Sequence, residues 1–219
     1  MFRPALALTQ ELARSPYFLI GHPPMTKPVK LLFFAGSARS GSHNKRLAKL
    51  GSAIAEANGI ASTFADLGDY PMPLYDADLQ NSEGIPGNAV KLEALMKIHT
   101  GVFIACPEYN ASITPLLKNT LDWISRIRND GEEPLAVFKT RVFALGSSSP
   151  GGMGGLRGLT TARTVLELGL GALVLPDQFA VPRAMEAYDD NGHLKSKDAN
   201  DQFKALIQKL ARAAHVLHG

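Results

Sequence analysis

Five short apolar runs, each separated from the next by a helical pattern or a polar loop, restrict the folds open to this chain. Each run is too short for a buried helix and is rich in the residues of strands buried on both faces. Strands that alternate with helices along a chain form a parallel sheet with helices covering both faces. The sequence therefore predicts an α/β fold with five parallel strands, at 29–34, 61–65, 102–106, 142–145 and 172–175.

The organisation around these strands is that of one domain. A chain of 219 residues with 45% hydrophobic content can bury a full core, and we assign residues 29–219 to this domain. Residues 1–28 hold five prolines and no sustained period, so we interpret them as an N-terminal arm that packs on a partner, or as a segment upstream of a native start at Met25. Since no run resembles a secretory signal or a membrane span, and Cys106 is the single cysteine, we expect a cytoplasmic protein.

Three loops in this pattern are unusual, and they follow the first, third and fourth strands. In parallel sheets, ligands bind beyond the carboxyl ends of the strands, where these loops meet. A fourth segment, 67–88, is rich in Pro, Gly and Asp and has no period, so we predict a long loop there. Thr114 and Pro115 predict the start of a helix after the third strand, as N-cap and first helical residue.

The loop after the first strand, Gly36-Ser-Ala-Arg-Ser-Gly-Ser42, predicts an anion pocket. A helical pattern begins near Ser42, and the free N–H groups of a helix N-terminus favour a phosphate. Ser37, Ser42 and Asn44 can donate hydrogen bonds, and Arg39 adds a permanent charge. No lysine follows Gly41, which excludes a Walker loop, and the glycine spacing does not fit a dinucleotide fingerprint. The pocket is therefore suited to a terminal phosphate.

Two further motifs give the chain a family resemblance. Gly36-Ser-Ala-Arg-Ser-Gly-Ser-His-Asn44 resembles the phosphate loop of the NADPH-dependent FMN reductase family, and Pro107-Glu-Tyr-Asn110 resembles its flavin-ring loop. Ser148-Ser-Pro-Gly-Gly-Met-Gly-Gly155 is similar to the family's third loop, and Pro71-Met-Pro-Leu-Tyr-Asp76 fits its long loop. The resemblance covers roughly residues 29–176. It implies a flavodoxin-like three-layer sandwich with sheet order 2-1-3-4-5 and FMN at the switch point.

The resemblance also assigns roles to individual residues. It implies that four residues hold the FMN phosphate, that four line the isoalloxazine, and that three lie near the same ring from the third loop. Tyr75 would cover the ring, either of its own subunit or of a neighbouring one. The residues that hold the phosphate are Ser37, Arg39, Ser42 and Asn44. Those that line the isoalloxazine are Pro107, Glu108, Tyr109 and Asn110. Those near the ring from the third loop are Ser148, Ser149 and Gly151.

The function implied is FMN-dependent oxidation of NADPH or NADH, with hydride passing through the flavin to a quinone, an azo compound or a similar small-molecule acceptor. The resemblance implies a homodimer or homotetramer. No side chain is assigned a catalytic role, because a flavin needs none for hydride uptake. A non-catalytic flavodoxin-like FMN carrier and a flavin-binding sensor are the alternatives; the net charge of +3 is unlike the strongly acidic flavodoxins.

Other residues are assigned to structure. We expect Cys106 and Trp123 in the core, the latter alternatively at a subunit interface. For Glu108 we expect a structural hydrogen-bonding role, with a general acid near the flavin as the alternative. We predict no metal site, and the scattered basic residues give no support to nucleic-acid binding. Arg126 and Arg128 are candidates for the 2′-phosphate of NADPH. The sequence leaves the acceptor and the choice between NADPH and NADH open.

Overall fold

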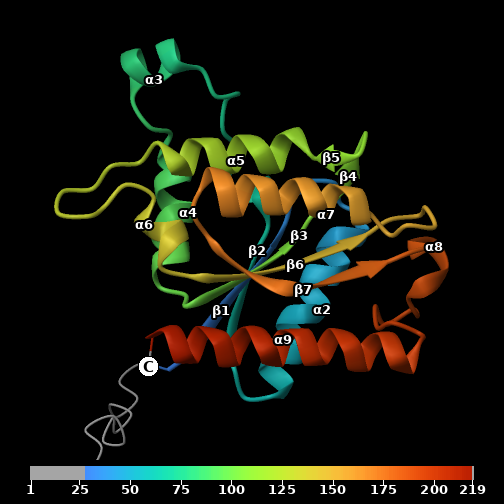
Figure 1. Cartoon of the computed structure of the whole chain (residues 1–219). Coiled ribbons are helices and arrows are strands. Elements are labelled where there is room, and N and C mark those ends of the chain that lie inside the picture. Colours follow the sequence, from blue (N-terminus) through green and yellow to red (C-terminus); the bar gives the residue numbers. More distant parts are fainter. Residues whose placement is uncertain (1–27, 219) are drawn as a thin grey trace, which may run out of the picture.

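The computed structural model describes residues 28–218, and its centre is a parallel sheet of five strands (Figure 1). The strand order is β2-β1-β3-β6-β7, which confirms the predicted order 2-1-3-4-5 for the sheet strands. The assigned N-terminal arm lies outside the described residues except for Pro28. The strands are β1 (Lys30–Ala35), β2 (Ala61–Ala65), β3 (Gly101–Ala105), β4 (Glu108–Tyr109), β5 (Ser112–Ile113), β6 (Val142–Ser148) and β7 (Leu173–Val181). The helices are α2 (His43–Ala57), α3 (Ala77–Glu83), α4 (Gly87–Lys97), α5 (Pro115–Ser125), α6 (Ala136–Lys139), α7 (Leu156–Arg163), α8 (Ala184–Ala187) and α9 (Lys197–His218).

The alternation of side chains along β1 divides the core into two layers. Leu31 and Phe33 pack with residues of α2 and α9, whereas Leu32 and Phe34 pack with residues of α4, α5 and α7. Figure 1 shows these helices on opposite faces of the sheet. Because successive strand residues point to opposite faces, an apolar run without alternation has to be covered on both sides. The molecule is therefore the three-layer sandwich that the apolar runs predict.

Two helices begin where the sequence predicts. The Ser42 side chain caps α2 by accepting a hydrogen bond from the Lys45 N–H, and Thr114 caps α5 in the same way through the Leu117 N–H, at 3.2 Å. The Thr114 hydroxyl also donates to the carbonyl of Gly36, at 2.6 Å. This last bond ties the start of α5 to the loop after β1.

The predicted long loop at 67–88 is wrong in part, because it contains a 3-10 turn (Leu67–Asp69) and α3. Asp76 caps α3 by accepting from the backbone N–H groups of Asp78 and Leu79, and no residue of α3 is buried. A helix that buries no face has no apolar period, so the pattern that reveals the other helices is missing here.

The last two sheet strands are longer than predicted. β6 continues through Ser148, and β7 runs to Val181 across an irregularity at Pro176 and Asp177, where the pairing with β6 shifts. The Arg163 guanidinium donates to the carbonyls of Leu175 and Pro176 on this bulge. The predicted strand ended at Leu175 because a proline interrupts the apolar pattern; in the structure the proline is accommodated at an edge strand.

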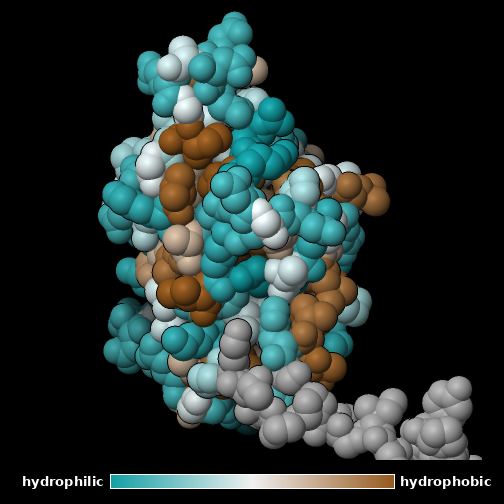
Figure 2. Space-filling view, turned by 90° about the vertical axis from the view of Figure 1, so that its left-hand side faces the viewer, coloured by the Kyte–Doolittle hydropathy of each residue, from teal (hydrophilic) through white to brown (hydrophobic). Residues whose placement is uncertain are grey.

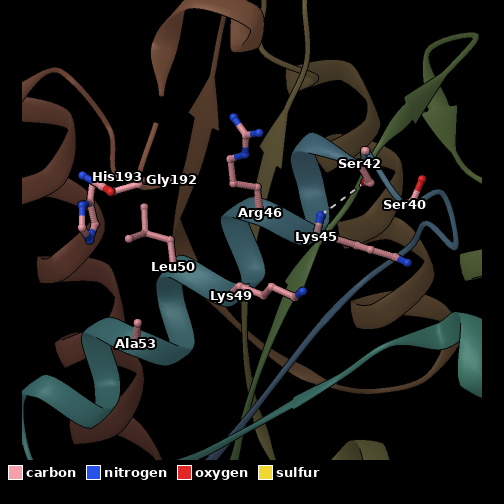
Figure 3. A pocket seen from close by; sticks show the side chains of 11 residues that line it. Ser40, Ser42, Lys45, Arg46, Lys49, Leu50, Ala53, Gly192 and His193 are labelled. Atoms are coloured by element: carbon pink, nitrogen blue, oxygen red, sulfur yellow. Dashed lines mark hydrogen bonds between the residues drawn. The ribbon is translucent and has the colours of Figure 1, made fainter. Parts of the chain in front are cut away.

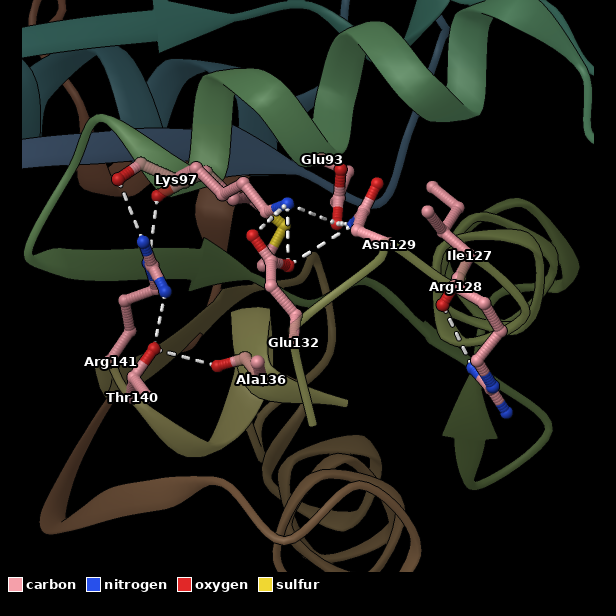
Figure 4. A network of polar contacts seen from close by, with 10 residues as sticks. Glu93, Lys97, Ile127, Arg128, Asn129, Glu132, Ala136, Thr140 and Arg141 are labelled. Carbon is pink, nitrogen blue, oxygen red and sulfur yellow. Dashed lines mark hydrogen bonds and ion pairs between the residues drawn. The ribbon is translucent and has the colours of Figure 1, made fainter. Parts of the chain in front are cut away.

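At the amino-terminal edge of the sheet, Arg141 holds the end of α4. Its guanidinium donates to the carbonyls of Met96 (2.9 Å), Lys97 (2.7 Å) and His99 (3.2 Å). Figure 4 shows Arg141 next to Lys97 at this end of α4. Lys97 in turn forms ion pairs with Glu93 and Glu132 at 3.0 and 2.7 Å. These charges satisfy one another at the edge opposite the unusual loops, so this network is structural.

The side of the molecule at the amino-terminal edge of the sheet carries exposed apolar side chains (Figure 2). A shallow groove between β7 and the end of α9 is lined by Leu173, Leu175, Val216 and Leu217, among others. Within residues 28–218, no helix combines the length and the apolar character needed to cross a membrane.

Candidate functional site

The loops after β1, β3 and β6 meet at the carboxyl edge of the sheet. The Gly36 N–H donates to the carbonyl of Ala105 at 2.9 Å, and the Cys106 N–H donates to the carbonyl of Gly146 at 2.7 Å. A β-carbon at Gly36 would lie 2.9 Å from the side chain of Leu117 and 3.2 Å from that of Pro107, so only glycine allows this approach. The predicted convergence of the three loops is confirmed.

In the first loop, Arg39 is the exposed cation. Among residues 28–218, its side chain makes one long hydrogen bond, at 3.4 Å to the carbonyl of Gly41, and Arg39 is exposed. The Ser37 hydroxyl accepts from the Arg39 N–H at 3.3 Å, which rigidifies the loop. The pKa of His43, the first residue of α2, is lowered by its burial and by the charges of Arg46 and Arg39. The potential around this loop is therefore positive, as an anion pocket requires.

Lys45 braces the same loop from inside. Its ammonium group donates to the carbonyl of Ala38 at 2.9 Å and to the carboxylate of Asp66 at 2.6 Å. Burial would raise the pKa of Asp66, but the hydrogen bonds from Lys45 and the Gly68 N–H outweigh it and leave the pKa lowered. Sequence reasoning missed both residues. Asp66 directly follows the second strand, so its place at the carboxyl edge was the available signal.

Asn44 and Ser148 join the first and third loops. The Asn44 amide donates to the Ser148 carbonyl at 2.8 Å and accepts from the Ser148 N–H at 3.0 Å. Both residues are buried, at 4% and 2% exposure. The Asn44 amide thus clamps Ser148 to the start of α2, and the predicted contacts of Asn44 with a phosphate and of Ser148 with a ring stay predictions.

The second loop forms a hairpin that the sequence did not predict. β4 and β5 pair antiparallel around Asn110 and Ala111, which both have positive φ, at 51° and 64°. A two-residue turn with two positive φ angles matches the twist of a hairpin, and Asn tolerates this conformation better than most residues. Tyr109 is 56% exposed beside this turn. Its ring is therefore available to a ligand at the mouth of the loops.

Glu108 connects this hairpin to α7. Its carboxylate accepts hydrogen bonds from the N–H groups of Arg157 and Gly158, at 3.1 and 3.2 Å, and from Arg157 Nε at 2.7 Å. Burial alone would raise the pKa of Glu108, whereas the bonds from Arg157 and Gly158 hold it below its ordinary value. An ionised carboxylate at a helix N-terminus is a stabilising cap. The expected structural role of Glu108 is confirmed.

The third loop is built from tight turns. The Ser149 hydroxyl accepts from the Gly151 N–H at 3.3 Å, and the Gly151 carbonyl accepts from Gly154 and Arg183. Gly155 precedes α7 with φ of 89°, and a β-carbon there would overlap the Ser147 hydroxyl at 1.9 Å. Gly154 and Gly155 are thus required by packing, whereas a β-carbon at Gly152 would meet no atom within 4 Å. Ser149 and Gly151 follow Ser148 in the same loop.

Several other predicted residues lie elsewhere. Cys106 is fully buried and its thiol pKa is raised to about 12 by burial, which confirms a core residue. Trp123 is also fully buried, with Tyr75 packed edge-on at 5.0 Å between ring centres. Arg126 lies over the Tyr75 ring, and Arg128 donates to carbonyls at the end of α5, away from the loops at its start.

A positively charged cavity of about 380 Å³ opens on the flank of α2, next to the first loop (Figure 3). Its wall includes Ser40, Ser42, Arg46 and Lys49 from the loop and helix, and Gly192 and His193 from the segment before α9. The Lys49 ammonium lies 5.2 Å from the centre of the Phe64 ring. Within residues 28–218, no group of three or more His, Cys, Asp or Glu residues is arranged to hold a metal ion.

The fold is flavodoxin-like, and the loop that carries Arg39 lies at the switch between β1 and β3. Residues 29–186 match the model of the NADPH-dependent FMN reductase family, and the chain belongs to this family. The resemblance stated from the motifs is therefore confirmed.

Three comparisons describe its relatives. The chain is 35% identical to a quinone reductase of Escherichia coli over 133 residues, which is 61% of this chain and 66% of that protein, just under two thirds of its length. It is 30% identical to an NAD(P)H-dependent FMN reductase of Pseudomonas aeruginosa over 89% of this chain and 100% of that protein. The flavoenzyme FerB, an NAD(P)H:acceptor oxidoreductase of Paracoccus denitrificans, superposes with a TM-score of 0.70 and 24% identity, covering 87% of this chain and 99% of that one.

Proposed function

We propose that this protein is an FMN-dependent NAD(P)H oxidoreductase that reduces quinones or similar small-molecule acceptors. The observation that carries the proposal is the meeting of two loops at one sheet edge. The positively charged first loop opens α2, and the hairpin loop with exposed Tyr109 follows β3. Family membership and the names of the quinone and FMN reductase relatives support the same reading.

The residues present fit an FMN. Arg39 has donors free for a phosphate, Ser37 lies beside it, and the N-terminus of α2 supplies backbone N–H groups. The positive charges of Arg39 and Arg46 both act on His43, the first residue of α2, and they would attract a phosphate at the same place. On this proposal Ser42 and Asn44 shape the phosphate loop. Pro107, Glu108, Tyr109 and Asn110 line the ring from one side, and Ser149 and Gly151 from the other.

FMN would supply the hydride chemistry when bound, and the protein binds and orients it. No acid, base or nucleophile of this chain is required for hydride uptake, and the Cys106 thiol, with a pKa raised to about 12 by burial, is unsuited to nucleophilic attack. We infer a ping-pong sequence in which the nicotinamide and the acceptor use the same exposed place beside Tyr109 in turn. We also propose a homodimer or homotetramer and a cytoplasmic location.

The direct test is the absorbance spectrum of the purified protein, followed by NADPH and NADH oxidation with a panel of quinones and azo compounds. A flavin spectrum with rapid acceptor-dependent turnover supports the oxidoreductase and eliminates a mere electron carrier. Intersecting rather than parallel double-reciprocal lines would contradict the shared place for donor and acceptor.

The phosphate assignment is tested by Arg39→Ala. A hydrogen bond to a charged group contributes on the order of 1.5–3 kcal/mol, so we expect FMN affinity to fall by roughly 10- to 150-fold, measured by fluorescence titration. Lys49→Ala is the matched control, because it removes one positive charge from α2, the helix that follows the loop of Arg39, while its ammonium contacts the Phe64 ring. Equal losses in both variants would reduce the role of Arg39 to general electrostatics, and unchanged affinity in Arg39→Ala would refute it.

A further inference from the structure

Tyr188 lies two residues beyond the part of the chain that matches the family model, yet its side chain reaches the loops of the candidate site. Its hydroxyl donates to Ser148 Oγ at 2.9 Å, and Tyr188 is only 5% exposed. Burial raises the pKa of the Tyr188 phenol, so it remains a hydrogen-bond donor across the neutral range. A tyrosine of the C-terminal segment is therefore in direct contact with the root of the third loop.

With this contact, every polar group of Ser148 has a partner. The Ser148 N–H and carbonyl both bond to the Asn44 amide, and its hydroxyl accepts from Tyr188. The next residue is fixed as well, because the Ser149 N–H donates to the carbonyl of Val181 and the Ser149 carbonyl accepts from the Ala184 N–H. The root of the third loop is thus held from α2 on one side and from the segment around α8 on the other.

Tyr188 is itself anchored to α2. The Arg46 guanidinium lies over its ring, 5.2 Å from the ring centre, and Asn44 and Arg46 are both in the first turn of that helix. Figure 3 shows Arg46 rising from α2 between the first loop and the segment that carries Gly192. The backbone of Tyr188 also pairs with Leu194 in an isolated antiparallel bridge. The tyrosine therefore belongs to the same rigid body as the start of α2.

This arrangement has a consequence for a ligand that binds at both ends. The two ends of FMN, a phosphate and a planar ring, are separated by a short ribityl chain, so both bind well only if the phosphate loop and the ring loops keep a fixed separation. Asn44 sits at the phosphate loop and Ser148 at the third loop, and their contact sets that separation. Tyr188 restrains Ser148 from the opposite side.

We propose that Tyr188 is a positioning residue that keeps the third loop in register with the phosphate loop, so that the phosphate and the ring of FMN bind together. This inference rests on the proposed function. It assigns a role to a part of the chain that the family match does not include.

The test compares FMN with riboflavin, which has the ring but no phosphate. In Tyr188→Phe only the hydroxyl is lost, and the net value of one hydrogen bond corresponds to about a fivefold change in affinity. We expect the FMN dissociation constant to rise about fivefold to tenfold. The riboflavin constant, which needs no register between the two ends, should stay within about twofold. Tyr70→Phe is the matched control, since no hydrogen bond of its hydroxyl occurs in residues 28–218, and its affinities should equal those of the wild type.

A second variant separates positioning from stability. Ser148→Ala combined with Tyr188→Phe removes both hydroxyl groups of the hydrogen bond, so no hydroxyl is left buried without its partner. The midpoint of urea unfolding should therefore be close to that of the wild type. FMN affinity should nevertheless stay as low as in Tyr188→Phe. Recovery of FMN affinity together with stability in the double variant would overturn the proposal.

Two other results for Tyr188→Phe would also overturn the proposal. One is an equal loss of affinity for FMN and for riboflavin. The other is an FMN dissociation constant within about twofold of the wild-type value. If the wild-type protein binds no FMN, the proposed function fails first. If it binds FMN and Tyr188→Phe behaves like the wild type, only the positioning role is lost.

Discussion

The Glu108 carboxylate makes a sharp prediction about how the hairpin loop is held. In the wild type it accepts three hydrogen bonds from Arg157 and Gly158, two from backbone N–H groups at the start of α7 and one from Arg157 Nε. Glu108→Gln keeps the shape of the side chain, but the amide nitrogen cannot accept, so at least one of these donors loses its partner and all lose the charge.

The size of the effect follows from burial. The Glu108 side chain is 8% exposed, whereas that of Arg157 is 59% exposed, so water screens the ion pair from one side. Hydrogen bonds to charged groups contribute about 1.5–3 kcal/mol when buried. Allowing for the exposed guanidinium, we expect Glu108→Gln to lower the free energy of unfolding by about 1–3 kcal/mol at pH 7.

The pH dependence provides the assay. The pKa of Glu108 is lowered in the folded state, where hydrogen bonds from Arg157 and Gly158 outweigh the opposing effect of burial. Its stabilisation is therefore fully present above the ordinary glutamate pKa of about 4.3 and is lost as the pH falls through the lower folded value. Urea unfolding at a series of pH values should show the wild type and Glu108→Gln converging in acid and separated at pH 7. Equal stability at pH 7, or a gap that does not close in acid, would refute this account.

Two further predictions concern the opposite edge of the sheet. Arg141→Met keeps the apolar stem but leaves three carbonyls at the end of α4 without their charged donor, and we expect a loss of about 2–4 kcal/mol in urea unfolding; a loss below about 0.5 kcal/mol would contradict the bonding described. The pKa of buried His99 is lowered by burial and by the charges of Lys30 and Arg141, so the unfolded chain takes up a proton first as the pH falls below the ordinary value of 6.5. The free energy of unfolding should therefore decrease from pH 7.5 to 5.5 in the wild type. In His99→Gln this decrease should be smaller. The decrease that is left in this variant comes from His43, whose pKa is lowered in the same direction.

The elements of the sheet could be predicted from the sequence because their signals are local. The strands β1 and β3 are buried on both faces. In any parallel sheet, burial on both faces gives an unbroken run of apolar residues in the sequence. The loops of the candidate site were found for the same reason, since each directly follows such a run. The caps at Ser42 and Thr114 depend on residues only three positions away.

What could not be predicted depends on pairs far apart in the chain. The Asn44 amide meets Ser148 across 104 positions, and nothing near Asn44 in the sequence distinguishes a side chain that clamps another loop from one that binds a phosphate. The Lys45–Asp66 ion pair was not predicted either, because its two residues are also far apart in the sequence. The hairpin after β3 was missed because Ala111 adopts a positive φ that alanine rarely takes, so its residue type gave no turn signal.

The bulge in β7 also changes what this edge of the sheet can pair with. β7 is an edge strand, and a regular edge strand offers a row of unpaired backbone groups to which a strand of another molecule can add. Pro176 has no N–H to offer, and it is exposed together with Asp177 at the point where the ladder shifts. Because Arg163 already occupies the carbonyls of the bulge, this edge has lost both the geometry and the acceptors that a growing aggregate would need. At this point of β7, the irregularity therefore interrupts the regular row of backbone groups to which another strand would pair.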